Sequence, residues 1–263
     1  MSSADYSERF GAIGRLYGTA GAEVLRSAHI CVVGIGGVGS WVVEALARSG
    51  VGAITLIDHD DISLTNINRQ LHTLDTTVGH SKVEEMAGRV LQINPDCQCH
   101  AIDDLLTEGN LEKYLSPEFD YVIDAIDSIR HKAAMIYYCR RNKIPIITTG
   151  GAGGLTDPTS IQIIDLSRTY NDPLASKVRS KLRSQYGFSK NPKRRFGVEC
   201  VFSPQQHHYP KADGTVCPRK PGVKGVTLDC NLGYGSATMI TASFGFAATA
   251  RAINKLIKKN GTV

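Results

Sequence analysis

The 263-residue sequence predicts an α/β fold with a mainly parallel sheet that is continued by antiparallel strands. Two observations lead to this class. Residues 30–33 and 54–57 are short apolar runs of the length expected for strands that are buried on both faces. Between them, residues 38–49 carry apolar side chains at helical spacing. Strand, helix and strand therefore alternate, as they do where helices cover a parallel sheet.

A glycine-rich turn joins the first of these strands to the helix. Gly34, Gly36 and Gly39 match the pattern G-x-G-x-x-G, with Gly37 beside them, and Asp58 ends the second strand. Gly34 allows a tight turn, and the next two glycines let backbone N–H groups approach phosphate oxygens. The last glycine lets the helix pack closely, and the aspartate can accept hydrogen bonds from ribose hydroxyls. This context indicates a Rossmann-like nucleotide-binding fold without deciding the nucleotide.

The remaining elements follow in order. Residues 5–26 predict an N-terminal helix that Gly18 and Gly21 interrupt. Further helices are expected at 79–92, 111–115, 129–142 and, within the basic segment below, after 174. Further strands are expected at 97–102, 121–123, 144–149, 160–166 and 198–202, of which 160–166 is expected to be antiparallel. Residues 203–225, rich in proline and glycine, predict a long loop.

Composition limits the class of protein. A net charge of +5, with 42% hydrophobic and 21% charged residues, is ordinary for a soluble chain. Residues 1–9 are polar and lack the apolar core of a signal peptide. The seven cysteines are scattered without a C-x-x-C pair, which is typical of reduced thiols in the cytoplasm. Residues 232–250 are nearly uncharged but rich in small residues, so we expect a buried helix and no stable membrane association.

These elements are expected to form one domain over residues 1–263. Its parts would be an N-terminal helical segment (1–28), a nucleotide-binding core (29–166), an insertion with a basic helix and loop (167–230) and a C-terminal helix (231–263).

Polar residues follow the second strand at close spacing. Asp58 is followed by Asp60, and Asn66 and Arg69 are three residues apart, so they would share one face of a helical turn. Lys82 falls in the first turn of the helix at 79–92, where the helix dipole disfavours a cation. That position suits a lysine that faces an anionic ligand, and a solvated lysine is the alternative.

Asp127 follows the strand at 121–123. The carboxyl ends of parallel strands meet at one edge of the sheet, so this aspartate should lie beside the glycine-rich turn. It could bind a metal ion there. It could equally cap the helix at 129–142, as Ser128 also could.

A basic segment spans residues 174–196 without an Asp or Glu. Its cations are Lys177, Arg179, Lys181, Arg183, Lys190, Lys193, Arg194 and Arg195. Such a segment is typical of a surface that binds nucleic acid, and a solvated helix face is the alternative. We favour RNA or another polyanion, with bases stacking on Tyr186, Phe188 and Phe196 if these rings are exposed.

The cysteines and histidines near the long loop allow fewer conclusions. His207, His208 and Cys217 lack zinc-ligand spacing and are interpreted as ordinary loop residues. Cys200 falls in a strand and is expected in the core. Cys230 lies between the loop and the last helix, where it is either an exposed nucleophile or a packed thiol.

The combined pattern points away from a dehydrogenase. A dehydrogenase needs the glycine-rich turn and Asp58, but it has no evident need for Asn66, Arg69, Lys82 and Asp127 at the same edge. An enzyme that promotes attack on the α-phosphate of ATP needs cations to neutralise the triphosphate and a carboxylate to hold Mg²⁺.

This constellation resembles the ubiquitin-activating-like adenylyltransferase family, which includes bacterial enzymes that adenylate the C-termini of small sulfur-carrier proteins. The resemblance covers residues 9 to about 166. It implies ATP and Mg²⁺ as cofactors and a homodimer in which Arg9 or Arg15 reaches the partner's site. The implied nucleotide-site residues are Gly34, Gly36, Gly37, Gly39, Asp58, Asp60, Asn66, Arg69, Lys82 and Asp127, with Asp127 as the Mg²⁺ ligand.

Five stretches resemble one tRNA-modifying branch of that family. They are GxxGRLYG at 11–18, CVVGIGGVGSW at 31–41, YVIDAIDS at 121–128, YCRRNKIP at 138–145 and TTGGAGG at 148–154. The resemblance implies an ATP-dependent, AMP-forming ligase that cyclises threonylcarbamoyladenosine in tRNA to its hydantoin form through an acyl-adenylate. It also implies sulfur-relay proteins as partners. Arg69, Lys82, Asp127 and Cys230 would be catalytic, and Lys177, Arg179, Lys181, Arg183, Lys193, Arg194 and Arg195 would bind tRNA.

Three other functions fit the sequence less well. An activator of a small sulfur-carrier protein would commonly carry two C-x-x-C pairs for zinc, which this sequence lacks. A non-catalytic, nucleotide-sensing RNA-binding module would not need Arg69, Lys82 and Asp127 together. An NAD-dependent oxidoreductase is less consistent with the same residues.

Overall fold

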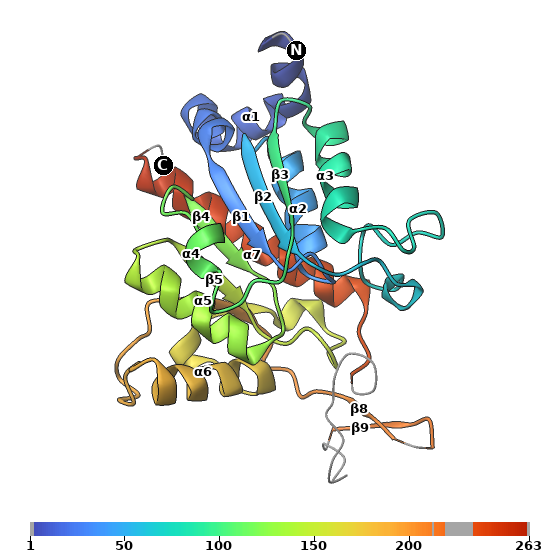
Figure 1. Ribbon diagram of the computed structural model, residues 1–263, viewed down its shortest axis with the longest axis vertical. Helices are drawn as coiled ribbons and strands as arrows, with labels where there is room; N and C mark the ends of the chain where they lie inside the picture. The colour runs from blue at the N-terminus through green and yellow to red at the C-terminus, as the bar shows by residue number, and fades with distance from the viewer. Residues whose placement is uncertain (1–2, 212, 219–233, 262–263) are drawn as a thin grey trace.

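The computed structural model describes residues 3–211, 213–218 and 234–261 (Figure 1). Within them, one sheet has seven strands in the order β3-β2-β1-β4-β5-β7-β6. The strands are β1 (His29–Val33), β2 (Ala53–Asp58), β3 (Gln98–Asp103), β4 (Tyr121–Asp124), β5 (Ile146–Thr149), β6 (Gln162–Asp165) and β7 (Glu199–Phe202). All neighbours pair in parallel except β6 and β7, which are antiparallel. The predicted fold class is confirmed.

Helices cover both faces of this sheet (Figure 1). They are α1 (Ser3–Ser27), α2 (Gly39–Arg48), α3 (Lys82–Ile93), α4 (Leu111–Tyr114), α5 (Ile129–Arg141), α6 (Pro173–Gln185) and α7 (Thr238–Lys259). Alternate strand residues divide between two cores: Ile30 and Val32 pack with α2, α3 and α7, whereas Cys31 and Val33 pack with α4, α5 and α6. This alternation is the two-residue period of a strand buried on both faces.

Small residues explain the position of α7. Gly245 lies against the start of α2, where a Cβ atom would sit 2.8 Å from the carbonyl oxygen of Val38. Phe244, Ala248 and Ala252 are fully buried in the same core. The nearly uncharged C-terminal segment therefore forms a buried helix, as predicted, although the helix begins at Thr238. In the described part of the chain, no helix is both long and apolar enough to cross a membrane.

The predicted interruption of the N-terminal helix is confirmed at Gly18, whose φ of 76° is open to glycine at little cost, but not at Gly21. Two other segments differ from the prediction. The helix predicted at 79–92 begins at Lys82, because Gly79 has a positive φ of 88° and Ser81 forms an extended bridge with Asp61. The predicted long loop contains a short antiparallel pair in its described part, β8 (Tyr209–Pro210) with β9 (Val216–Cys217).

Candidate nucleotide site and basic surface

The candidate site lies at the carboxyl ends of β1, β2 and β4, which are neighbours in the sheet. Hydrogen bonds join the segments that leave these strands. The N–H of Gly34 donates to the carbonyl of Ile57 at 2.9 Å, and the N–H of Ala125 donates to the carbonyl of Val33 at 2.8 Å. The glycine-rich turn, the end of β2 and the loop after β4 thus form one continuous edge, as predicted.

The glycine-rich turn requires glycine at two of its positions. Gly34 has a φ of 87°, which L side chains rarely adopt. Gly39 begins α2, and a Cβ atom there would lie 1.7 Å from the carbonyl oxygen of Gly34. The first turn of the helix therefore folds back onto the start of the loop. Gly36 and Gly37 lie between them and are partly exposed, so their backbone can be reached by a ligand.

Asp58 ties the end of β2 to this turn. One carboxylate oxygen accepts the N–H of Ile35 at 2.5 Å, and the other accepts the N–H of Asp60 at 2.9 Å. A carboxylate oxygen has more than one acceptor position, so these bonds leave capacity for the ribose hydroxyls that the sequence predicts. The half-buried side chain orients the loop before any nucleotide binds.

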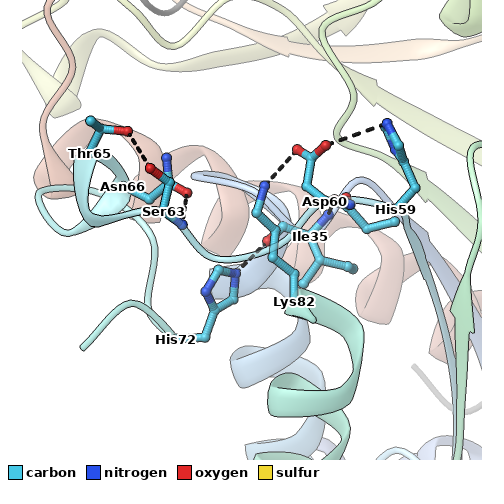
Figure 2. A network of polar contacts seen from close by, with 9 residues as sticks. Ile35, His59, Asp60, Ser63, Thr65, Asn66, His72 and Lys82 are labelled. Atoms are coloured by element: carbon cyan, nitrogen blue, oxygen red, sulfur yellow. Dashed lines mark hydrogen bonds and ion pairs between the residues drawn. The ribbon is translucent and has the colours of Figure 1, made fainter. Parts of the chain in front are cut away.

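Lys82 is buried, so the alternative of a solvated lysine is wrong. Its side chain is 6% exposed, and its Nζ lies 2.7 Å from a carboxylate oxygen of Asp60 (Figure 2). Asp60 itself is 52% exposed and also faces His59 at 3.5 Å. The first turn of α3 therefore carries an ammonium group whose partner is open to solvent.

Asn66 and Arg69 lie on the turn that begins with the short helix Leu64–Asn66. The buried Asn66 accepts the N–H of Ser63 at 3.1 Å, so its side-chain oxygen shapes the turn. Arg69 is half-buried, and its Cγ would lie 3.4 Å from a Cβ atom at Gly37. Its guanidinium donates to the carbonyl of Thr65 at 2.8 Å. The structure thus brings the predicted arginine beside the glycine-rich turn.

His72 is a site residue that sequence reasoning missed. Its Nε2 lies 2.8 Å from the carbonyl oxygen of Ile35 (Figure 2). A carbonyl only accepts, so Nε2 must carry the proton. Burial lowers the pKa of His72, and nearby Lys82 lowers it further, which favours the neutral ring. Ile35 is thus held through its N–H by Asp58 and through its carbonyl by His72. The available signal was the position of His72, three residues after Arg69 at the end of the predicted polar residues.

A second missed group lies beneath the loop after β4. Asp124 and Lys132 are fully buried and 2.8 Å apart, and Thr148 donates to the same aspartate at 2.6 Å. Burial raises the pKa of Asp124, and Lys132 opposes that rise. The cluster links β4, β5 and the first turn of α5, and it therefore fixes the loop that carries Asp127. An apolar strand with one terminal acid gave no sign of this pairing.

Asp127 is exposed between β4 and α5, as a carboxylate that meets a metal–phosphate complex must be. Ser128 occupies the N-cap position of α5 without a side-chain capping bond, so its predicted capping role is wrong. Among the described residues, one group of three could also surround a metal: the ligand atoms of Asp58, His59 and Asp60 lie within 4.8 Å of one another. However, Asp58 already accepts two backbone N–H groups, and Asp60 pairs with Lys82.

Comparisons with known proteins show the family of this chain and the fold that it shares with solved structures. The sequence profile of the ThiF family matches residues 10–261. The chain belongs to the ThiF family. It is 55% identical over 255 residues to the tRNA threonylcarbamoyladenosine dehydratase of Escherichia coli (strain K12), covering 97% of this chain and 95% of that protein. It is 56% identical over 256 residues to the protein of the same name from Haemophilus influenzae (strain ATCC 51907 / DSM 11121 / KW20 / Rd), again covering 97% and 95%.

A solved structure of the E. coli enzyme in complex with ATP has the same fold as this ThiF-family chain. The two share 51% sequence identity and a TM-score of 0.87, over 99% of this chain and 98% of the other.

The basic segment of this ThiF-family protein divides into exposed and anchored cations. Lys177, Lys193, Arg194 and Arg195 are exposed. In contrast, Arg179 donates to the hydroxyl of Thr169, and the guanidinium of Arg183 lies over the ring of Phe196 at 5.3 Å. The surface open to RNA is therefore smaller than the predicted set, and it consists of one helix position and the loop after α6.

The aromatic residues of that segment pack inward, so the expected stacking of bases on them is not supported. Stacking was expected only if the rings are exposed, and Phe196 is buried at 4% exposure, so this ring does not meet the condition. Phe188 packs edge-on against it at 4.9 Å, and Tyr186 lies 4.9 Å from Tyr137 of α5. The rings anchor the end of α6 and the loop after it, because burying them stabilises the fold more than leaving them in water would.

The cysteines and the loop histidines have mixed outcomes. Cys200 is buried in β7 as predicted, and burial raises the pKa of its thiol well above the ordinary value. Cys230 lies outside the described residues, so its catalytic role stays a prediction. His207 lies in the loop and joins no candidate metal group among the described residues, in line with its interpretation, but it is 3% exposed and packs edge-on against Tyr234.

Proposed function

We propose that this protein uses ATP to cyclise threonylcarbamoyladenosine in tRNA to its hydantoin form, releasing AMP and pyrophosphate. The observation that carries this proposal is the set of cations beside the glycine-rich turn, Lys82 and Arg69, in a chain so similar over its length to enzymes named for that reaction. The reaction activates a carboxylate, which is a poor acyl donor until it carries a good leaving group.

In the first step, the threonyl carboxylate of the substrate attacks the α-phosphorus of ATP. A bond forms from the carboxylate oxygen to phosphorus, and the bond to pyrophosphate breaks. Negative charge accumulates on the phosphate oxygens, and Lys82 and Arg69 neutralise it. Because Lys82 is already buried against Asp60, it needs little reorganisation when the triphosphate arrives.

The nucleoside end of ATP is held by the turn itself. Asp58 accepts the ribose hydroxyls, and the backbone around Gly36 and Gly37 donates to phosphate. Asp58 and His72 fix the peptide groups of Ile35 from opposite sides, so the N–H groups of the loop are oriented before binding. Asn66 supports the turn that carries Arg69 through its bond to Ser63.

Asp127 would hold Mg²⁺. Its exposed carboxylate is a hard oxygen ligand at the edge where the phosphates lie, and Mg²⁺ in such sites is commonly held by one or two carboxylates together with phosphate oxygens. When bound, the ion supplies positive charge to the leaving pyrophosphate. The Asp124–Lys132 pair positions the loop from below.

In the second step, a nitrogen of the threonylcarbamoyl group attacks the activated acyl carbon and expels AMP. The new carbon–nitrogen bond closes the hydantoin ring, and the substrate loses the elements of one water. The attack is intramolecular, so correct orientation supplies much of the rate without a covalent enzyme intermediate. The chain has to hold the modified nucleotide in place while the ring closes.

The phosphates of the tRNA backbone would be bound by the exposed cations of the basic segment, which are Lys177, Lys193, Arg194 and Arg195. Lys181 is half-buried, and Arg179 and Arg183 would support this surface from within. We also propose a cytoplasmic location, because tRNA is found there and because the described cysteines are free thiols.

A homodimer is part of the same proposal. Leu64, Ile67 and Met239 are more than half exposed, although burial is the usual state of such side chains, and a second copy would cover them. Asn68 and Thr238 hydrogen-bond the two segments that carry these residues. Arg15 is the better candidate to reach the partner's site, because Arg9 donates to the carbonyl of Ile93 in its own chain. Sulfur-relay partners stay a prediction of the resemblance.

The test measures AMP release with ATP, with and without tRNA that carries threonylcarbamoyladenosine, followed by mass spectrometry of the nucleosides. We expect AMP release that depends on the modified tRNA and loss of one water from the nucleoside. AMP or adenylate formation triggered by a small sulfur-carrier protein, with no effect of tRNA, would overturn the substrate and leave the nucleotide site in place.

A further inference from the structure

A cavity of about 450 Å³ lies between α1, α2 and α3, away from the nucleotide site. Its polar lining consists of Arg9, Arg48, Arg89 and Gln92, and Phe10 and Ile93 complete it. Among the described residues that line it there is no carboxylate. A cavity of this size with three arginines and no acid among its described lining residues has the composition of an anion-binding site.

One buried carboxylate orients two of these arginines. Glu44 of α2 lies 2.7 Å from the Nε of Arg48, and it receives the Nε and Nη2 of Arg89 at 2.7 and 3.0 Å. Although burial favours the neutral acid, the two guanidiniums hold the pKa of Glu44 below its ordinary value. The carboxylate is therefore ionised, and it fixes both arginines at the rim of the cavity.

The arrangement leaves charge and donors unused. Among the described residues, the ion pairs of these three arginines involve a single carboxylate, that of Glu44, which pairs with Arg48 and Arg89. Arg48 donates to Glu44 only through its Nε, and Arg89 donates through its Nε and Nη2. In the part of the chain that the structure describes, both terminal nitrogens of Arg48 and the Nη1 of Arg89 have no hydrogen-bond partner. Arg9 makes one long bond of 3.4 Å to Ile93.

The cavity is separate from the ATP site. The helix α2 begins at Gly39 in the glycine-rich turn and ends at Arg48, so its ten residues put about 15 Å between the two. In the same way, α3 begins with Lys82 at the nucleotide site, and Arg89 lies two turns farther along it. The cavity thus lies toward the amino ends of the strands, where one nucleotide could not fill both sites.

We propose that this cavity binds a phosphate-bearing anion. The guanidinium fork matches the oxygens of a phosphate group, and fixed arginines lose little side-chain freedom on binding. Two sources carry this chemistry: a phosphodiester of the tRNA backbone and free pyrophosphate. Binding of a tRNA phosphodiester rests on the proposed function, whereas binding of free pyrophosphate does not.

The test uses Arg9→Gln/Arg48→Gln, which removes two of the three charges but keeps the Arg89–Glu44 pair that packs the helices. Its matched control is Arg140→Gln/Arg141→Gln, which removes two exposed charges from the end of α5. Unchanged thermal melting without anion verifies that each variant folds. If the double variant melts early, Arg9→Gln alone keeps the test valid, because it leaves all three hydrogen bonds to Glu44 intact.

The first arm titrates inorganic pyrophosphate calorimetrically into protein whose ATP site is filled by a non-hydrolysable ATP analogue. The second arm measures tRNA affinity over a salt series. Binding of free pyrophosphate that weakens at least tenfold in the variant, but not in the control, identifies a free-anion site. A salt slope for tRNA that falls by about one to two identifies a backbone contact. If neither quantity differs from the wild type, the proposal is overturned, and the arginines serve only to hold the three helices together.

Discussion

Lys82 is placed against its local preference. It carries an ammonium group into the first turn of α3, where the helix dipole disfavours a cation. Its side chain is 6% exposed, whereas that of its partner Asp60 is 52% exposed. The protein thus keeps a dehydrated positive charge whose counter-ion is open to solvent and can be supplemented by phosphate. Such a charge stabilises a negatively charged transition state more than it stabilises the fold.

Lys82→Ala should therefore lower AMP release at least about 100-fold, with little change in thermal melting. The loss of stability is small because Asp60 stays hydrated and the helix dipole favours the change. The measurement is AMP formation with modified tRNA, together with a melting curve, and Lys113→Ala at an exposed position serves as the control. Normal turnover in Lys82→Ala would remove this lysine from the mechanism.

At the scale of elements, α2 depends on the turn that precedes it. Gly39 is already helical, yet a Cβ atom would collide with the carbonyl of Gly34 at 1.7 Å. Gly88 in α3 is also helical, but a Cβ atom there would meet nothing within 4 Å. Replacing each glycine with alanine therefore distinguishes two effects. At Gly88 the change alters only helix propensity, whereas at Gly39 it also introduces a steric clash at the nucleotide site.

Gly39→Ala should destabilise the protein by about 1–3 kcal/mol and weaken ATP binding, because the turn must open to admit the methyl group. Gly88→Ala should instead stabilise it by about 0.4–1 kcal/mol, with ATP affinity unchanged. Urea melts and ATP titrations of both variants measure these effects. Equal behaviour of the two variants would mean that Gly39 matters only through backbone entropy.

A second pair of elements, β7 and α7, is joined by ion pairs. Glu199 of β7 receives Arg251 at 2.5 Å and Lys255 at 2.8 Å, both from α7. The hydrogen bond from Arg251 lowers the pKa of Glu199 from 4.5 to about 2, and Lys255 adds to this effect. The pKa is depressed in the folded state, so the stabilisation is present above pH 4.5 and is lost as the pH falls toward 2.

Glu199→Gln should accordingly lower the free energy of unfolding at pH 7 by about 1–3 kcal/mol. The lower part of this range is expected because Arg251 and Lys255 are partly exposed, so solvent screens their ion pairs with Glu199. The difference from the wild type should shrink as the pH falls from 4.5 toward 2. Urea melts at several pH values test this window. A difference that does not depend on pH would assign the loss to packing at this position.

At the scale of the whole molecule, the loop after α6 and the helices α1, α2 and α3 lie at opposite ends of the fold (Figure 1). Both regions carry clustered positive charge: Lys193, Arg194 and Arg195 in the loop, and the three arginines of the cavity between the helices. The net charge of +5 is modest, so position matters more than amount. A large polyanion such as tRNA can use surfaces that are far apart.

Arg194→Gln/Arg195→Gln should weaken tRNA binding and reduce the slope of log affinity against log salt by about one to two, because exposed cations release counter-ions on binding. ATP affinity should stay the same. Filter binding over a salt series measures the slope, and Lys258→Gln/Lys259→Gln at the exposed end of α7 is the matched control. An unchanged slope would place the tRNA surface elsewhere.

Residue pattern alone predicts the α/β class, the glycine-rich turn and the edge of the sheet that carries Asp58, Lys82 and Asp127. It does so because local period and spacing indicate which residues form strands, and parallel strands bring their carboxyl ends together. The burial of polar groups depends instead on contacts in the folded protein. Asp124 with Lys132, and His72 with Ile35, are contacts between segments that no local pattern encodes. The rings of the basic segment likewise turned inward because α5 offered them an apolar surface.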